Sequence, residues 1–286
     1  MGRSDVTPAA PKPVNDGRMP LLAHLREFRN RMGWSMLAIF IGVVVAFFLW
    51  EPIFEFLRRP YEQVTLDKNT TGLPGFADDQ LYTFGPLEQF AVRLRVSFIA
   101  GVICTSPVWL YHFGAFITPA LHRKERRYAA GFLGAALLLF GTGCVFAYLT
   151  IDRGLEFLLN IGGEDISTLL NVQKYLNFVT LTLLAFGISF LFPLVVFFLN
   201  LVGLFPAATM RKWRRGMFVG IFAVAAVVTP SQDPFTFVFL SIPIYGLYEV
   251  VILLARVRER RKVTQLGNDP GLGDDEQSQI EPREPV

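Results

Sequence analysis

The stretch that decides the fold is Tyr175–Phe205, YLNFVTLTLLAFGISFLFPLVVFFLNLVGLF, in which 31 consecutive residues carry no charge. An α-helix rises about 1.5 Å per residue, so roughly 20 apolar residues cross a hydrocarbon core of ~30 Å. This run is long enough to cross. Because every backbone N–H and C=O group in lipid needs a partner within the protein, we expect the run to be helical.

Five further uncharged runs flank this one, at Met32–Trp50, Val96–Leu121, Tyr128–Ile151, Gly216–Gln232 and Phe235–Tyr248. The composition agrees with a membrane protein, since 52% of the residues are hydrophobic and only 18% are charged, against about 25% in a soluble domain. Strand-like alternation is absent, which argues against a barrel. The sequence therefore predicts an all-α membrane protein with six transmembrane helices, at about residues 33–50, 90–113, 128–151, 174–203, 215–230 and 235–255.

The last two runs are the shortest and flank the turn at Ser231–Pro234. A re-entrant hairpin is the alternative to two full spans, and in either case the chain returns to the side from which it started. We expect the first run to be a retained span, since it is too long for the apolar region of a signal peptide and no small-residue cleavage site follows it.

Lysine and arginine predict the orientation, because they are enriched in cytoplasmic segments. In the six-span arrangement twenty of the 27 fall on the side of both termini and seven on the other. We therefore predict that both termini are cytoplasmic. The net charge of +3 hides this asymmetry between the two sides and does not indicate a nucleic-acid partner.

The chain divides into three parts. We predict a flexible arm at residues 1–19, a six-span membrane domain at 20–256, and a disordered cytoplasmic tail at 257–286 that is first basic and then acidic. Pro52 and Pro60 frame a short helical stretch in the first external loop. Prolines within or at the ends of spans should kink the helices into a curved, concave bundle; they are Pro107, Pro193, Pro230 and Pro243.

Signals for chemistry are weak. The sequence contains no zinc-protease, nucleophile-elbow, phosphate-loop or Cys/His metal motif, so we expect no enzyme activity, no metal and no cofactor. Cys104 and Cys144 lie inside predicted spans, and we expect no disulfide. A small-solute secondary transporter is the alternative function, but the span interiors lack ionisable residues and the chain shows no repeat.

Two acidic residues stand out in basic surroundings on the predicted cytoplasmic side. Glu27 lies in HLREFRNR (24–31) and Glu125 in HRKERR (122–127). The simplest interpretation is local pairing, for example between Glu27 and Arg31 one helical turn later, which contributes only ~0.2–1 kcal/mol when exposed.

Four motifs together resemble the TatC family, the multispan core of the twin-arginine protein translocase. The first is HLREFRNRM (24–32), similar to the family's H-L-x-E-L-R-x-R-L. The second is SPVWLYHFGAFITPAL (106–121), followed by KERR (124–127). The third is AFGISF (185–190) with Pro193, and the fourth is VTP (228–230) with Asp233, then IPIY (242–245) and Tyr248-Glu249. The motifs cover residues 20–255 in the expected order.

The resemblance implies a function in the bacterial cytoplasmic membrane. Such proteins bind the twin-arginine signal peptides of folded cargo at the cytoplasmic face. With single-span TatA- and TatB-like subunits they form a multimeric complex that exports the cargo using the proton-motive force. Carried onto this chain, the signal-peptide site comprises Glu27, Glu125, Leu25, Arg29, Phe116, Arg126 and Arg127. The partner-helix docking site comprises Thr229, Pro230 and Asp233.

Three positions depart from the family's pattern. Leu191 stands where many relatives have Glu or Gln before the proline of span four, His112 replaces a Gln in span two, and Phe237 replaces a Gln early in span six. We therefore expect the partner helix to dock along spans five and six through a more apolar contact than in many relatives.

Overall fold

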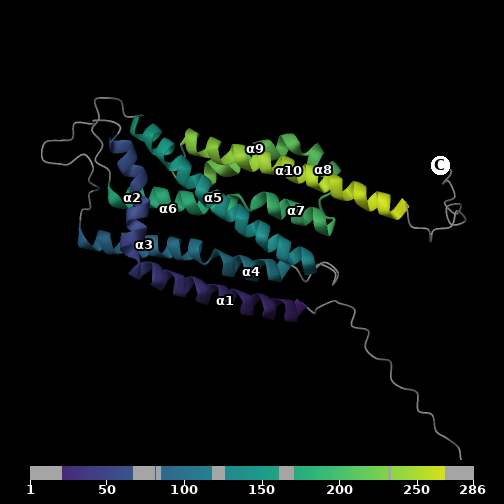
Figure 1. Ribbon diagram of the computed structural model, residues 1–286, viewed down its shortest axis with the longest axis horizontal. Helices are drawn as coiled ribbons and strands as arrows, with labels where there is room; N and C mark the ends of the chain where they lie inside the picture. The colour runs from purple at the N-terminus through teal and green to yellow at the C-terminus, as the bar shows by residue number, and fades with distance from the viewer. Residues whose placement is uncertain are drawn as a thin grey trace, which may run out of the picture.

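The computed structural model describes residues 21–66, 81, 85–117, 126–160, 171–230 and 233–267, and every element that these residues form is an α-helix (Figure 1). The all-α fold is thus confirmed. The predicted arm at residues 1–19 lies outside the described residues. The helices are α1 (Leu21–Phe48), α2 (Trp50–Leu66), α3 (Pro86–Cys104), α4 (Ser106–Ile117), α5 (Arg126–Asn160), α6 (Val172–Ser189), α7 (Phe192–Val202), α8 (Ala207–Lys212), α9 (Arg214–Val228) and α10 (Pro234–Gly267).

Several helices are long and apolar enough to cross a membrane, as the sequence predicts. Four continuous stretches meet this description within the described residues, and the α3–α4 pair, bent by 55°, makes a fifth if it forms one span. Helix α9 has 15 residues, or about 22 Å at ~1.5 Å per residue, which is less than the hydrocarbon thickness. The count of six and the orientation therefore remain predictions.

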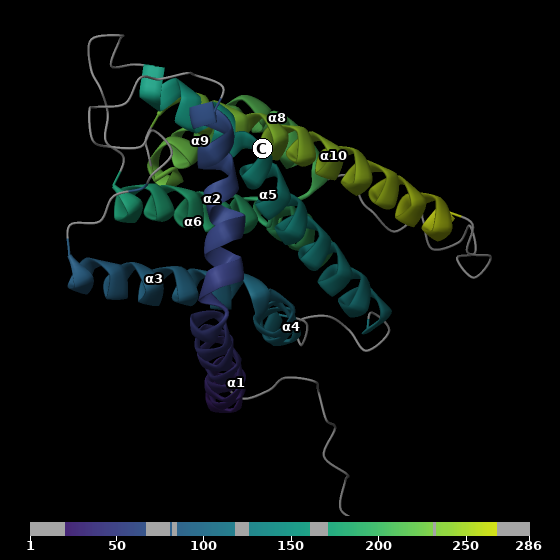
Figure 2. The ribbon, with the colours of Figure 1, turned by 60° about the vertical axis from the view of Figure 1, so that its left-hand side comes forward.

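Helix α2 lies crosswise over one end of the bundle (Figures 1 and 2). It contains both Pro52 and Pro60 and continues to Leu66, so it is longer than the stretch that the two prolines frame. One face, with Leu57, Tyr61 and Val64, is buried. Tyrosines below it donate to its backbone: Tyr175 Oη to the Leu57 carbonyl at 2.7 Å and Tyr148 Oη to the Phe56 carbonyl at 3.1 Å.

The bend between α3 and α4 follows from Pro107, which lacks the N–H that would continue the helix. Two side chains donate to carbonyls near the bend. Thr105 Oγ1 donates to the Gly101 carbonyl at 2.7 Å, and Trp109 Nε1 donates to the Val102 carbonyl at 2.9 Å. A polar backbone group left without a partner in lipid is costly, so these bonds stabilise the bent form.

Helices α1 and α3 cross at a pair of glycines. A Cβ atom on Gly101 would lie 2.6 Å from the Val43 nitrogen and 2.9 Å from the Gly42 carbonyl carbon. A Cβ atom on Gly42 would lie 2.5 Å from Thr105 Cγ2. Backbone therefore touches backbone at this crossing, as small residues allow between membrane helices.

The substitution Gly101→Ala is expected to destabilise the protein by about 1–3 kcal/mol, because the added methyl group forces α1 away from α3. The measurement is thermal unfolding of the purified protein in detergent, followed by tryptophan fluorescence. Gly141→Ala in α5 is the matched control, since a Cβ there meets nothing within 4 Å. Equal melting temperatures for the two variants would contradict the close crossing.

Candidate functional site

The start of α1 and the end of α4 meet, which brings two of the predicted site segments together. In Figure 1 α1 runs alongside the α3–α4 pair, and it contacts both helices. The rings of Phe28 and Phe116 lie 4.9 Å apart between centroids, tilted by 54°. This aromatic contact joins the segment before the first predicted span to the segment after the second.

Glu27 is paired within its own helix. Its Oε1 atom accepts hydrogen bonds from Arg31 Nη2 at 2.6 Å and from Arg31 Nε at 3.0 Å. The local pair expected from the i,i+4 spacing is thus present. Both bonds end on one oxygen, so Oε2 stays outside this ion pair. The Glu27 side chain is 25% exposed.

Leu25 and Arg29 lie one helical turn apart beside this pair, and both are exposed. Leu25 is 55% exposed. Phe116 is half-buried on α4. The site therefore combines a carboxylate, two arginines and an apolar rim on neighbouring helices.

Of the other predicted members of the signal-peptide site, Arg126 and Arg127 lie at the start of α5. Glu125 lies outside the described residues, and Arg126 and Arg127 form the first turn of α5 without a described side-chain environment. The two helices pack nearby, because a Cβ atom on Gly114 of α4 would lie 3.8 Å from Phe132 Cδ1 of α5. Helix α5, which begins at Arg126, therefore packs against α4 at Phe132.

The residues predicted to dock the partner helix lie between α9 and α10. Thr229 and Asp233 are buried, and only Pro230 of the three is exposed. Asp233 Oδ1 accepts a hydrogen bond from the Thr236 backbone N–H at 2.6 Å and so caps the start of α10. The Thr229 Oγ1 atom is buried without a hydrogen-bond partner.

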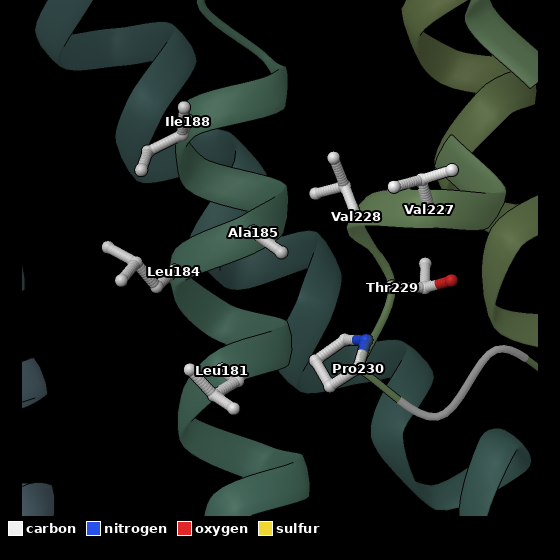
Figure 3. Close-up of a pocket in the computed structure, with 8 residues that line it drawn as sticks. All are labelled: Leu181, Leu184, Ala185, Ile188, Val227, Val228, Thr229 and Pro230. Carbon is white, nitrogen blue, oxygen red and sulfur yellow. The ribbon is translucent and has the colours of Figure 1, made fainter. Parts of the chain in front are cut away.

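An apolar groove beside these residues was missed by the sequence reasoning. It has a volume of about 370 Å³ and lies between α6 and the end of α9 (Figure 3). Figure 3 shows the Thr229 hydroxyl turned away from α6, and the groove lining is mostly apolar. A pattern that could have found half of it is the i, i+3, i+4, i+7 spacing on α6. The lining residues are Leu181, Leu184, Ala185, Ile188, Val227, Val228, Thr229 and Pro230.

The three departures from the family's pattern occupy apolar surroundings. Leu191 packs against the cluster that contains Leu110 and Phe140. The Phe237 ring contacts the Phe222 ring edge-on at 6.4 Å. His112 has a buried Nδ1 atom without a hydrogen-bond partner and packs against Tyr111 at 5.4 Å between centroids.

Comparison with known proteins identifies the family. The family model described as "Sec-independent protein translocase protein (TatC)" matches residues 23–243. The chain belongs to the TatC family. It is therefore a component of the twin-arginine protein translocase, and the resemblance found in the sequence is confirmed.

Relatives and solved structures agree. The TatC protein of Frankia casuarinae is 45% identical over 94% of this chain and 74% of the relative. That of Aquifex aeolicus is 34% identical over 85% of this chain and 98% of the relative. A crystal structure described as "Twin Arginine Translocase Receptor- TatC" in DDM superposes with a TM-score of 0.68 at 34% identity, covering 81% of this chain and 99% of that one. The chain is thus a multi-pass membrane protein of the protein-translocation machinery.

The Glu27–Arg31 pair is expected to contribute little to stability, because i,i+4 pairs on helix surfaces are worth about 0.3–0.5 kcal/mol. A double-mutant cycle with Glu27→Gln and Arg31→Gln measures this coupling from the free energy of unfolding in detergent. A coupling above about 2 kcal/mol would mean that the pair stabilises the fold strongly. Glu27 would then be poorly suited to exchanging Arg31 for a ligand.

Proposed function

We propose that this protein is the signal-peptide receptor of the twin-arginine translocase. It binds the paired arginines of folded cargo at the cytoplasmic face and hydrolyses nothing itself. The observation that carries the proposal is the meeting of α1 and α4 at Phe28 and Phe116, beside an accessible Glu27 carboxylate. The binding patch comprises Glu27, Leu25, Arg29 and Phe116, together with Arg126 and Arg127 at the start of α5 and Glu125, which precedes them in the sequence.

The chemistry of Glu27 suits an arginine ligand. A guanidinium is a planar fork whose two N–H groups match a carboxylate, and lysine does not reproduce this geometry. Arg31 shows that a guanidinium can pair with this carboxylate, since two of its nitrogens donate to Glu27 Oε1. An incoming arginine can bind through Oε2, or it can displace Arg31, whose own pairing is weak.

Because the surroundings are basic, the binding of a cationic peptide depends on the carboxylates. Arg29 and Arg31 repel a cationic peptide unless a negative charge compensates. Each charge-assisted hydrogen bond contributes about 1.5–3 kcal/mol, which gives only modest affinity for two arginines. The apolar part of the signal peptide must then supply further binding, and the exposed Leu25 offers apolar surface beside the pair.

The receptor proposal predicts that Glu27→Gln lowers the affinity for a peptide carrying Arg-Arg by about 10- to 100-fold, since one charge-assisted contact is lost. Arg31→Gln should leave the affinity equal or higher, because it removes the internal competitor. The measurement is a pull-down of the purified protein with Arg-Arg and Lys-Lys versions of one signal peptide.

Glu62→Gln on α2 is the matched control, since Glu62 pairs with Arg58 through the same i,i+4 geometry at 2.8 Å. It should bind like the wild type. Equal capture of the Arg-Arg and Lys-Lys peptides by the wild type would reject the receptor function. Wild-type affinity in Glu27→Gln would reject the assigned site.

We further propose that TatA- and TatB-like single-span subunits dock along the apolar groove and the α9–α10 turn, with Thr229, Pro230 and Asp233 at its edge. The groove supports an apolar contact, because its α6 side presents only Leu181, Leu184, Ala185 and Ile188. In the proposed topology residues 20–256 cross the bacterial cytoplasmic membrane six times, both termini are cytoplasmic, and export by the multimeric complex uses the proton-motive force.

Filling the groove should weaken partner docking. Ala185→Phe places a ring between α6 and α9 and is expected to lower the co-purification of a TatB-like subunit severalfold. Ala223→Phe is the control, since Ala223 lies exposed on α9 outside the groove. If both variants retain the partner equally, the helix docks elsewhere.

A further inference from the structure

The corner between α8 and α9 carries a dense basic surface. Arg211, Lys212, Trp213, Arg214 and Arg215 follow one another where the six-residue α8 ends and α9 begins, and all five side chains are exposed. α8 and α9 lie beside α10 in Figure 1. The corner is therefore a cationic ridge next to a long helix.

Helix α10 holds this corner in place. Glu259 Oε1 accepts hydrogen bonds from the Ala207 backbone N–H at 2.9 Å and from Asn200 Nδ2 at 2.8 Å. Tyr248 Oη donates to the Met210 carbonyl at 2.9 Å. These bonds tie the start and the middle of α8 to α10.

Three cations of the corner are not paired with a carboxylate of α10. Glu249 is paired with Arg214, whose Nε donates to Oε1 at 2.8 Å, and it also accepts from Tyr245 Oη at 2.9 Å. Glu259 accepts hydrogen bonds from Asn200 and Ala207. Among the described residues, Arg211, Lys212 and Arg215 have no ion pair or side-chain hydrogen bond. Their charges face outward on a fixed scaffold.

Trp213 marks the boundary between polar and apolar surface. Its ring packs on Gly216, where a Cβ atom would lie 3.2 Å from Cε3, and it remains 58% exposed. Leu204 before the corner and Val219 after it are 72% and 65% exposed. An exposed indole between cations and exposed aliphatic residues is typical of a side chain at the level of lipid headgroups.

We propose that the α8–α9 corner binds the headgroup of an anionic phospholipid, with Arg211, Lys212 and Arg215 contacting the phosphate and Trp213 lying at the interface. Charge complementarity supports this occupant, since basic clusters beside membrane helices attract anionic headgroups. A twin-arginine peptide is disfavoured here because it carries the same sign of charge. The inference is independent of the receptor function.

The test uses the full-length protein in nanodiscs containing a photoactivatable phosphatidylglycerol probe at subsaturating concentration. Adducts are mapped by peptide mass spectrometry. We expect labelling of the segment 204–219, and competition by unlabelled phosphatidylglycerol but not by phosphatidylcholine. Each cation at a membrane surface changes affinity about fivefold, so the triple variant Arg211→Gln, Lys212→Gln, Arg215→Gln should lower this labelling to less than about a tenth.

Two variants make the result specific. The control triple variant Arg59→Gln, Arg153→Gln, Lys174→Gln removes three exposed cations elsewhere and should leave labelling of 204–219 unchanged. The charge-preserving variant Arg211→Lys, Arg215→Lys should retain most of it, which separates loss of charge from loss of fold. Equal competition by the two lipids, or an equal loss in the control, would overturn the proposal. Labelling that appears only in the absence of partner subunits would instead indicate that the ridge is a protein interface.

Discussion

The contact between Gly42 and Gly101 is the constraint on which the arrangement of the proposed receptor site depends. Because backbone meets backbone there, the axis of α1 is fixed against α3. Arg93 strengthens the same pair farther along, since its Nη2 atom donates to the Phe47 carbonyl at 2.8 Å and its guanidinium lies 4.4 Å from the Phe47 ring centroid. The bend at Pro107 then directs α4 along α1, so Phe116 reaches Phe28. A site built from two distant segments is thereby set by one crossing and one bend.

The membrane imposes the second constraint, namely that buried polar groups find partners within the chain. Tyr175 and Tyr248 meet it by donating to carbonyls of helices that lie across their own, at Leu57 and Met210. These bonds attach the short helices α2 and α8, which contribute little apolar length of their own, to the long helices of the bundle. The scaffold is thus closed at both ends by hydrogen bonds from buried tyrosines, while its sides are left to apolar packing.

The sequence predicts the helices well because uncharged length is a direct consequence of the bilayer's thickness. The Glu27–Arg31 pair is also predictable, since it depends only on spacing within one helix. The Phe28–Phe116 contact depends on the crossing at Gly101 and on the bend after Thr105. The local sequence predicts neither the angle at which the helices cross nor the angle of the bend. The groove was missed for a related reason. The spacing of Leu181, Leu184, Ala185 and Ile188 shows that they share one apolar face of α6. On a membrane helix such a face could equally face lipid, and only the position of α9 shows that it lines a groove.

The departure at Leu191 bears on how the proposed partner docking can work in this chain. With leucine packed into the apolar cluster around Phe140, span four offers no intramembrane carboxylate to a partner. Burial of apolar surface gives little drive between helices in lipid, because lipid tails are equally apolar, so association depends on close packing. The groove meets this requirement through Ala185, whose small side chain lies between the larger Leu181 and Ile188 and lets another helix approach the α6 backbone. The shape of the groove, rather than charge, would then select the partner. Thr229 and Asp233 are buried within the fold, so altering them would disturb the fold as well as the docking surface. Filling the groove at Ala185 changes the docking surface more directly.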